Sequence, residues 1–319
     1  MRSFKLLFIL AIFYTLNAAE SKDDRDVFNL RSDHHLISSG RFHSCGIDKR
    51  PGIEIGGTVK CWGHNDQGQA SPPHGIFVQV SSGHFHSCAL TIEGVVKCWG
   101  SKEINHSIED SSETFDDICS GEQHSCAIRS KDGTIKCWGR NDFGELNVPS
   151  DKKFIQVSCG NGHTCGIMTN GEVACWGKSR YGESHPPLNT MFKQISVGPA
   201  HHACGITSNS EIKCWGNNNR GQSSPIEGKF KQVSAGARST CAIHENVGLK
   251  CWGSGSPIDS NQLLLFEESR VLKGASYKQI SSGHGHLCAL LDWNGKVHCW
   301  ASGADFKAHE VPLGFKAAL

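Results

Sequence analysis

One phrase recurs along this chain and constrains its fold more than any other feature. In its clearest copy, residues 80–100, small residues lead to a glycine, then to His-x-Cys-x-Leu, a glycine turn and Val-x-Cys-Trp-Gly. A repeat of this size that holds several short strands is typical of β-propellers and solenoids. The glycine that opens the phrase recurs at Gly40, Gly83, Gly121, Gly160, Gly198, Gly236 and Gly283. The sequence therefore predicts an all-β, seven-bladed β-propeller.

Each repeat is expected to contribute three clear strands and a weaker outer strand. In the second strand, His86, Cys88 and Leu90 alternate with small residues. In the third, Cys98 points away from the side that carries Trp99. The apolar residues of the first strand are three apart, so this strand is assigned from its place in the repeat. The alternation predicts that cysteine and aliphatic side chains form one face of a blade, and small residues and tryptophan the other.

Fourteen of the 16 cysteines follow the repeat, one in each His-x-Cys and one before each tryptophan. Opposite positions in a hairpin bring Cα atoms to about 4.5 Å, which suits a disulfide. A zinc site built from His-x-Cys and the later cysteine is the alternative. The sixth repeat keeps both cysteines although Ser239 replaces the histidine, which favours disulfides and no metal. The predicted pairs are Cys45–Cys61, Cys88–Cys98, Cys126–Cys137, Cys165–Cys175, Cys204–Cys214, Cys241–Cys251 and Cys288–Cys299.

Two further sets of side chains need an interpretation. The repeated histidines are expected to be structural, each bonding a backbone group near its turn, because a catalytic histidine belongs to one pocket rather than to every repeat. They are His43, His86, His124, His163, His202 and His286. Cys119 and Cys159 lie outside the pattern. They either bridge neighbouring blades or remain buried thiols, and their positions differ by one residue in the strand, so their side chains are expected to point in opposite directions.

The N-terminus has the features of a secretory signal peptide. Residues 1–19 hold a basic start, an apolar run from Leu6 to Leu16 and small residues, with cleavage expected after Ala18 or Ala19. The run is shorter than the roughly 20 residues of a membrane span, so an uncleaved anchor is the less favoured alternative. Residues 20–34 are read as a polar leader and residues 35–319 as one propeller domain. We expect a secreted, monomeric protein without a membrane span in its mature form.

Composition and motifs narrow the function classes. Many cysteines behind a signal peptide indicate an oxidising compartment. The chain has 32 basic and 31 acidic residues, so no field favours nucleic acid. Catalytic and phosphate-binding motifs are missing, and neither enzymatic activity nor a cofactor is expected. Asn105 begins a glycosylation sequon, residues 261–270 resemble a short amphipathic helix, and residues 314–319 resemble the beginning of an eighth first strand.

The phrase Gly-x-x-His-Ser-Cys-Ala-Leu, with the later Val-x-Cys-Trp-Gly and Asn-x-x-Gly-Gln, resembles the regulator-of-chromosome-condensation repeat over about residues 35–319. The resemblance implies a seven-bladed propeller of four-stranded blades. Secreted propellers and the ectodomains of crinkly-type plant receptor kinases look similar in plan. The family's nucleotide exchange on a nuclear GTPase is not expected here, because the signal peptide, the disulfides and the near-neutral charge oppose it.

Binding residues are expected where the repeats differ. The turn after the first strand and the turn after the third should emerge on one face, and their residues vary on a repetitive frame. Arginine and aromatic residues are frequent interface anchors, so a protein partner is favoured over a glycan, with solvated turns as the third interpretation. The candidate binding residues are Arg41, Phe42, His84, Phe85, Arg140, Phe143, Arg180, Tyr181, Arg220 and Arg238.

Overall fold

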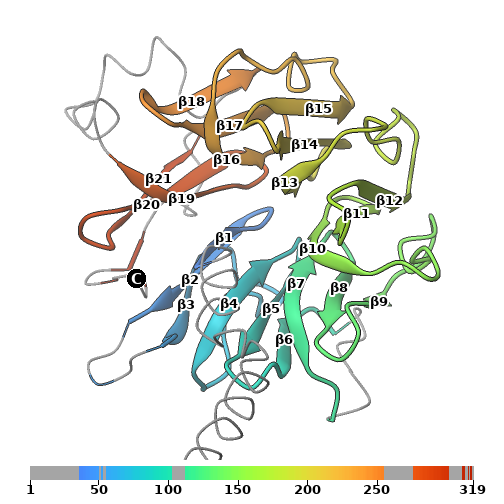
Figure 1. Ribbon diagram of the computed structural model, residues 1–319. Helices are drawn as coiled ribbons and strands as arrows, with labels where there is room; N and C mark the ends of the chain where they lie inside the picture. The colour runs from blue at the N-terminus through green and yellow to red at the C-terminus, as the bar shows by residue number, and fades with distance from the viewer. Residues whose placement is uncertain are drawn as a thin grey trace, which may run out of the picture. The chain divides into compact units, whose positions relative to one another are not determined.

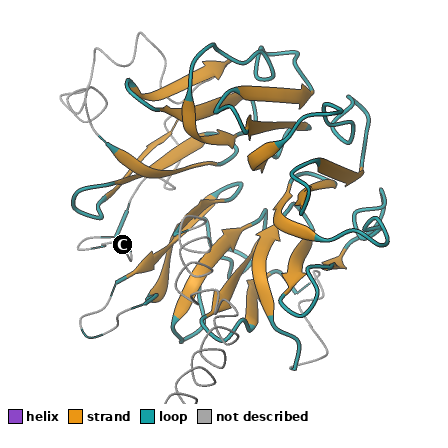
Figure 2. Cartoon of the chain, viewed as in Figure 1, coloured by secondary structure: helices purple, strands orange, loops and turns teal. Residues whose placement is uncertain are grey.

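The computed structural model describes residues 36–49, 52, 55–102, 112–254, 276–301, 311, 312, 315 and 317. Contacts divide the chain into Met1–Asp33 and His34–Leu319, and all that follows concerns the second unit. The predicted signal peptide, the leader, Asn105 and the predicted helix lie outside the described residues. In the described part Figure 2 shows strands joined by loops. No helix in that part is long and apolar enough to cross a membrane.

The described strands form seven antiparallel sheets of three strands each, here called blades 1 to 7 in chain order. In Figure 1 they follow one another from blue β1–β3 to red β19–β21. Their bounds are β1 Ile37–Ser39, β2 His43–Asp48, β3 Thr58–Gly63, β4 Phe77–Ser82, β5 His86–Thr91, β6 Val96–Gly100, β7 Phe115–Ser120, β8 His124–Arg129, β9 Ile135–Gly139, β10 Phe154–Cys159, β11 His163–Met168, β12 Val173–Gly177, β13 Phe192–Val197, β14 His202–Thr207, β15 Ile212–Gly216, β16 Phe230–Ala235, β17 Ser239–His244, β18 Gly248–Gly253, β19 Tyr277–Ser282, β20 His286–Leu291 and β21 Val297–Ala301.

The second and third strands pair as their alternation predicts. In blade 2, Cys88 lies opposite Cys98 and Ser87 lies opposite Trp99. The same register recurs in every blade, and all seven predicted hairpin disulfides are present with Cα–Cα distances of 4.0–4.1 Å. The prediction of one disulfide per blade is confirmed.

The first strand contains a bulge that explains its irregular pattern. In blade 4 the register with the second strand shifts between Phe154 and Gln156, so that Ile155 is passed over. Blades 2 to 7 share this shift. A bulge adds one residue to a strand. The aromatic residue and the aliphatic residue three positions later therefore both pack in the core, although strict alternation would separate them.

Neighbouring blades pack through the two faces that the alternation predicts. Between blades 2 and 3, Cys88 and Leu90 pack against Phe115, Ile118 and Trp138. The other interfaces repeat this arrangement. Each disulfide is thus buried in the apolar layer between two blades.

The fourth, outer strand expected of each blade is not present among the described residues, and this prediction was wrong. The segments after the third strands contain Pro72, Pro149 and Pro225. Proline cannot donate to a strand ladder. Asparagine side chains also take up backbone donors there: Asn65 Oδ1 accepts from Ala70 N, and Asn218 Oδ1 accepts from Ser223 N. These segments are turns because their side chains compete with a fourth strand for the backbone.

The ring is closed by both ends of the propeller. Ile37 N donates to Gln279 Oε1, and Ser39 N donates to Ser281 Oγ. Ala317 forms an antiparallel bridge with Asp48. It takes the place that Phe77 has opposite Thr91 in blade 2. The Phe315 ring lies 5.6 Å from Trp62, as Phe-Trp pairs do in other blades. The described residues of the tail thus complete the first strand of blade 1, as its sequence predicts.

Candidate binding face

Two sets of turns share one face of the ring, here called the mouth face. They follow the first and third strands of each blade, and backbone hydrogen bonds join them: Ser101 N donates to Phe85 O, and Arg140 N donates to Gln123 O. The turns between the second and third strands lie at the other end of the strands, on what we call the hairpin face. The shared face predicted for the variable turns is therefore correct.

A cavity of about 190 Å³ lies inside the ring of first strands. Its wall consists of serine, glycine, glutamine and small aliphatic residues of these strands, together with Cys119 and Cys159. Its mouth is lined by Arg41, His84, Glu122, Asn161 and His284. All five are titratable or amide side chains, so the mouth is the part of the cavity that holds its charged and strongly polar groups.

The wall of the cavity is built from links between successive blades. The serine two residues before each landmark glycine accepts a hydrogen bond from a backbone N–H of the next blade, as Ser81 Oγ does from Ser120 N at 2.8 Å. Six of the seven interfaces have this link. Glutamine side chains add a second layer, since Gln194 both donates to Val233 O and accepts from Val233 N. The serine and glutamine side chains of the wall thus form hydrogen bonds that hold the blades together.

Cys119 and Cys159 form an eighth disulfide, which joins blades 3 and 4. Cys119 stands where the other blades have the accepting serine, and Cys159 stands at the N–H donor position of the next blade. The two positions face each other at every interface, so the expectation of opposite side chains was wrong. Their sulfur atoms lie within 4.8 Å of Cys126, and all three belong to disulfides.

The repeated histidines are structural, but their partner differs from the predicted one. His86 Nε2 lies 2.8 Å from Ser125 Oγ, the hydroxyl that precedes the inner cysteine of the next blade. Five interfaces have this imidazole–hydroxyl pair at 2.7–2.9 Å. Burial, with weaker repulsion from nearby histidines, lowers the pKa of His43, His124 and His202 to about 3. In these five histidines the partner is a hydroxyl of the next blade and not the predicted backbone group, whereas the Nδ1 of His163 lies 3.5 Å from Asn161 O at its turn, as predicted.

The two remaining interfaces depart from this pair in different ways. Between blades 6 and 7 both partners change, to Ser239 and Leu287, and both are buried. Between blades 4 and 5 only one changes: His163 is retained while Ala203 replaces the hydroxyl. His163 Nε2 is buried without a hydrogen-bond partner. Burial lowers the pKa of His163 to about 4.

Four predicted residues meet at the mouth of the cavity. The ring of buried His84 stacks on Phe42 at 6.1 Å and lies 4.7 Å from Phe85. The Arg41 guanidinium lies 4.7 Å over Phe42, and its Nη1 is 3.3 Å from His84 Nδ1. Phe42 and Phe85 are partly buried, whereas turn tips were expected to bury little. The structure brings these four side chains into one cluster, here called the His84 cluster.

Buried glutamine and glutamate residues support a second row of tips. Glu145 Oε2 accepts from Phe143 N, and Glu183 Oε2 accepts from Tyr181 N. The backbone oxygens of the same glutamates accept from tryptophan Nε1 atoms of the next blade. Gln69 and Gln222 act in the same way. The Gly-Gln or Gly-Glu pair thus links these four tips to the neighbouring blade.

The other predicted residues lie on the mouth face but apart from the His84 cluster. Phe143 is 54% exposed, and Lys178 Nζ lies 4.6 Å over its ring. Arg180 lies 5.4 Å over Tyr181. Arg140 contacts Asp142 and Gln123, and Arg220 and Arg238 are exposed.

Sequence reasoning missed Lys178 and His201 as binding candidates. His201 is an inserted residue with φ of 62°, and its ring lies 5.7 Å from Tyr181. The signal was present, because blade 5 has one residue more than the other blades between the landmark Gly198 and Cys204.

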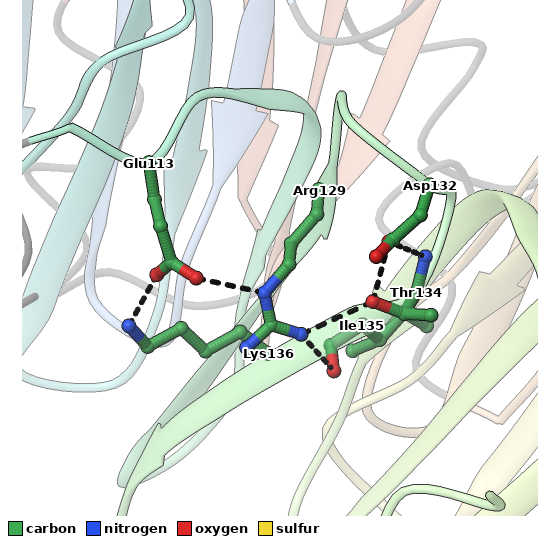
Figure 3. Close-up of polar contacts among 6 residues, drawn as sticks. All are labelled: Glu113, Arg129, Asp132, Thr134, Ile135 and Lys136. Carbon is green, nitrogen blue, oxygen red and sulfur yellow. Dashed lines mark hydrogen bonds and ion pairs between the residues drawn. The ribbon is translucent and has the colours of Figure 1, made fainter.

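The hairpin face has a different character. Figure 3 shows Glu113 contacting both Arg129 and Lys136 beside the β8–β9 turn, where Asp132 accepts from the backbone and hydroxyl of Thr134. The bonds from Lys136 and Arg129 lower the pKa of Glu113, and the Thr134 hydroxyl lowers that of Asp132. These charges are paired with one another at the surface, which marks them as turn-stabilising.

Comparison with known proteins supports the fold and the repeat. The family model of the regulator of chromosome condensation (RCC1) repeat matches residues 77–103, 115–145, 154–183 and 192–222. The CRINKLY WD40 ectodomain of the Arabidopsis thaliana receptor kinase ACR4 is 22% identical, with a TM-score of 0.66, covering 89% of this chain and 97% of that one.

Two further structures are similar. The ectodomain of the Physcomitrella patens receptor kinase CR4 is 22% identical, with a TM-score of 0.69, covering 84% of this chain and 73% of that one. Prp20p from Saccharomyces cerevisiae, described with binding properties to Gsp1p and histones, is 16% identical, with a TM-score of 0.59 and coverages of 76% and 75%. No curated protein matches the chain in sequence. At these identities the structural likeness shows the fold.

Proposed function

Because this chain is a propeller of regulator-of-chromosome-condensation repeats with a disulfide in every blade, we propose that it is an extracellular protein-binding module without enzymatic activity. Its mouth face contacts a protein partner, with the His84 cluster as the anchor and Phe143, Tyr181 and the exposed arginines around it. The signal peptide over residues 1–19, the domain start at residue 35, glycosylation of Asn105 and a monomeric state are parts of this proposal.

The observation that carries the proposal is the His84 cluster itself. It joins an arginine, a buried imidazole and two phenylalanines within a few ångströms, on turns that the hydrogen-bonded frame holds in place. Interface energy concentrates in a few such aromatic and arginine anchors. A frame that fixes anchors before binding reduces the entropy lost on association.

Disulfides support the extracellular part of the proposal. Eight disulfides join the sixteen cysteines. Such bonds persist in oxidising compartments and are rare in the nucleus. The nuclear partners named for Prp20p are therefore poor candidates here, and the receptor-kinase ectodomains are the more relevant relatives by environment.

A glycan-binding propeller is the second candidate. Phe143 and Tyr181 occupy equivalent tips of neighbouring repeats, as a repeated sugar pocket requires. A cation already covers one face of each ring, Lys178 over Phe143 and Arg180 over Tyr181. A sugar that stacks on that face has to displace the cation, so the protein-binding assignment is favoured.

In the test, the secreted protein is immobilised on a resin and used to isolate its partner from extracellular fluid. The affinity of the isolated partner is then measured for the protein and its variants. Phe42→Ala combined with Phe85→Ala removes both rings that contact His84, and we expect the Kd to rise at least tenfold, or about 1.4 kcal/mol. The melting temperature of the variant is measured in parallel, because both rings are partly buried.

The matched control lies on the hairpin face. Thr91 is unsuitable, since it is buried and its Oγ1 accepts from Val95 N. Ile92, 42% exposed, and the exposed Lys131 serve instead. Ile92→Ala with Lys131→Ala should leave the Kd unchanged. The face assignment is wrong if this control abolishes binding while the phenylalanine pair does not. Binding to a glycan array that is lost in Phe143→Ala with Tyr181→Ala would favour the second candidate.

A further inference from the structure

The polar side chains in the wall of the axial cavity are already hydrogen-bonded, so a ligand is recognised by the residues at the mouth. The serine hydroxyls and glutamine amides of the wall are engaged in links between blades. A cavity of about 190 Å³ holds a small side chain together with several water molecules. The chemistry of what enters is therefore set by Arg41, His84, Glu122 and His284 at the mouth.

Arg41 has more hydrogen-bond donors at this mouth than there are acceptors for them. Its backbone N–H donates to Gly83 O, and its Nη1 lies 3.3 Å from His84 Nδ1. Its Nε is buried and has no hydrogen-bond partner. A buried unsatisfied donor is uncommon and costly. The natural complement of the free edge of a guanidinium is an oxyanion that accepts two parallel hydrogen bonds.

His84 cannot supply the missing acceptor without losing its own contact with Glu122. Its Nδ1 lies 3.3 Å from Arg41 Nη1 and also 3.1 Å from Glu122 Oε1. A ring nitrogen accepts when it carries a lone pair and donates when it carries a proton. If it accepts from Arg41, then Glu122 loses its donor; if it donates to Glu122, then Arg41 loses its acceptor. One more acceptor beside Arg41 satisfies all three groups.

Among the described residues the mouth has one carboxylate, and the other charged or titratable groups that act on its residues are arginine, lysine and histidine side chains. Glu122 lies on the side of blade 3, and the hydrogen bond from His84 lowers its pKa. Burial first, and then Arg41, His84 and Arg238, lower the pKa of His284 in blade 7. Arg41 also acts on Glu122. An incoming anion that contacts Arg41 and His284, in blades 1 and 7, lies away from the Glu122 carboxylate of blade 3.

We infer that the axial cavity receives one carboxylate of the protein partner, an aspartate or glutamate side chain, held by Arg41 and flanked by His84 and His284. This inference rests on the proposed function and adds the chemistry of the partner: its contact surface presents an acidic residue that enters the centre of the ring. The aromatic residues of the His84 cluster then surround the point of insertion.

The test titrates the folded protein with N-acetyl-glutamate N′-methylamide, whose only charge is the side-chain carboxylate, and follows the imidazole resonances of His84 and His284. The uncharged glutamine compound is the control ligand. We expect saturable shifts with the glutamate compound alone. Arg41→Gln should weaken this binding at least tenfold, Arg41→Lys should weaken it less, and Lys131→Gln on the hairpin face should leave it unchanged. Unshifted resonances of buried His43 and His124 establish that each variant is folded.

Three results overturn the inference: equal shifts with the glutamine compound, undiminished binding by folded Arg41→Gln, or tighter binding of inorganic sulfate or a sialic acid glycoside than of the glutamate compound. The last reassigns the cavity to a sulfated or sialylated glycan. Partner affinity separates this failure from that of the proposed function. If Phe42→Ala with Phe85→Ala loses the partner while Arg41→Gln keeps it, only the cavity assignment falls. If the glutamate compound binds but neither variant affects the partner, the protein-binding face is wrong.

Discussion

The two ends of the blades are stabilised in different ways, although one repeat supplies both. At the mouth end, buried side chains reach into the next blade, as His86 does to Ser125 and Ser81 does to Ser120. At the hairpin end, turns are held by their own exposed side chains, such as Asp132 with Thr134. The variable tips therefore lie at the end of the blades that has more hydrogen bonds to neighbouring blades. Binding residues gain from such rigid support.

Acid should destabilise the mouth end first. Burial holds the pKa of His43, His124 and His202 near 3 and that of His163 near 4, below the unfolded value of 6.5. The unfolded chain therefore binds protons that the folded chain does not. The stability is fully present above pH 6.5 and is lost as the pH falls toward 3. At pH 5 each imidazole removes about 2 kcal/mol, together about 8 kcal/mol.

Thermal unfolding between pH 8 and pH 4 measures this effect. We expect the steepest fall of the melting temperature between pH 6.5 and pH 4. His124→Gln should make that fall shallower, because one proton-uptake site is gone. Carboxylates at the hairpin end, such as Asp132, have a lowered pKa and lose their contribution only at more acidic pH. A melting temperature that is flat down to pH 4.5 contradicts the assignment.

Glycine substitutions should separate the two ends next. An added Cβ at Gly283 would lie 2.4 Å from Gly40 O and 2.4 Å from the His286 ring, at the closure of the ring. At Gly133 in the β8–β9 turn, nothing lies nearer than 3.5 Å, although φ is +74°. We expect Gly283→Ala to cost about 3 kcal/mol, and Gly133→Ala about 1 kcal/mol from the left-handed conformation. Urea unfolding of both variants measures the difference, and equal losses would remove the contrast.

Much of the frame could be predicted because its rules are local. Alternation in His86-Ser-Cys-Ala-Leu sets the register of a hairpin, and the register pairs Cys88 with Cys98. The same alternation assigns the packing faces between blades. The predicted shared face of the variable turns also follows from strand order alone. These inferences need only the sequence of one repeat.

Contacts between repeats could not be predicted, because they depend on how one blade is offset against the next. The offset places Cys119 opposite Cys159 and aims each imidazole at a hydroxyl of the neighbour. The outer strand failed for another reason, since asparagine side chains capture its backbone donors. At the mouth, the meeting of Arg41 with His84 and Glu122 needs three successive blades.

The Cys119–Cys159 bond tests whether the links at the mouth end are interchangeable. It closes a loop of 40 residues and replaces a serine-to-backbone hydrogen bond. Cys119→Ser with Cys159→Ser recreates the pair seen at other interfaces. A cross-link of this length contributes about 3–4 kcal/mol on the chain-entropy model, and the regained hydrogen bond returns about 1 kcal/mol. We expect a net loss of about 2 kcal/mol in denaturant unfolding. No loss would show that the disulfide adds nothing beyond the serine.

The smallest expected effect is a gain, at the interface between blades 4 and 5. Both members of the imidazole–hydroxyl pair change between blades 6 and 7, which leaves no orphan, whereas Ala203 alone leaves His163 Nε2 buried without a partner. Removing one partner of a buried pair costs more than replacing both. Ala203→Ser restores the hydroxyl that five other interfaces hold at 2.7–2.9 Å from the imidazole. It should raise the stability by about 1 kcal/mol, and His163→Gln should cost less than His124→Gln, because His163 has no hydroxyl to lose. If Ala203→Ser is destabilised, then blades 4 and 5 pack too closely to hold a hydroxyl at this position, and the alanine methyl group already occupies the space opposite His163.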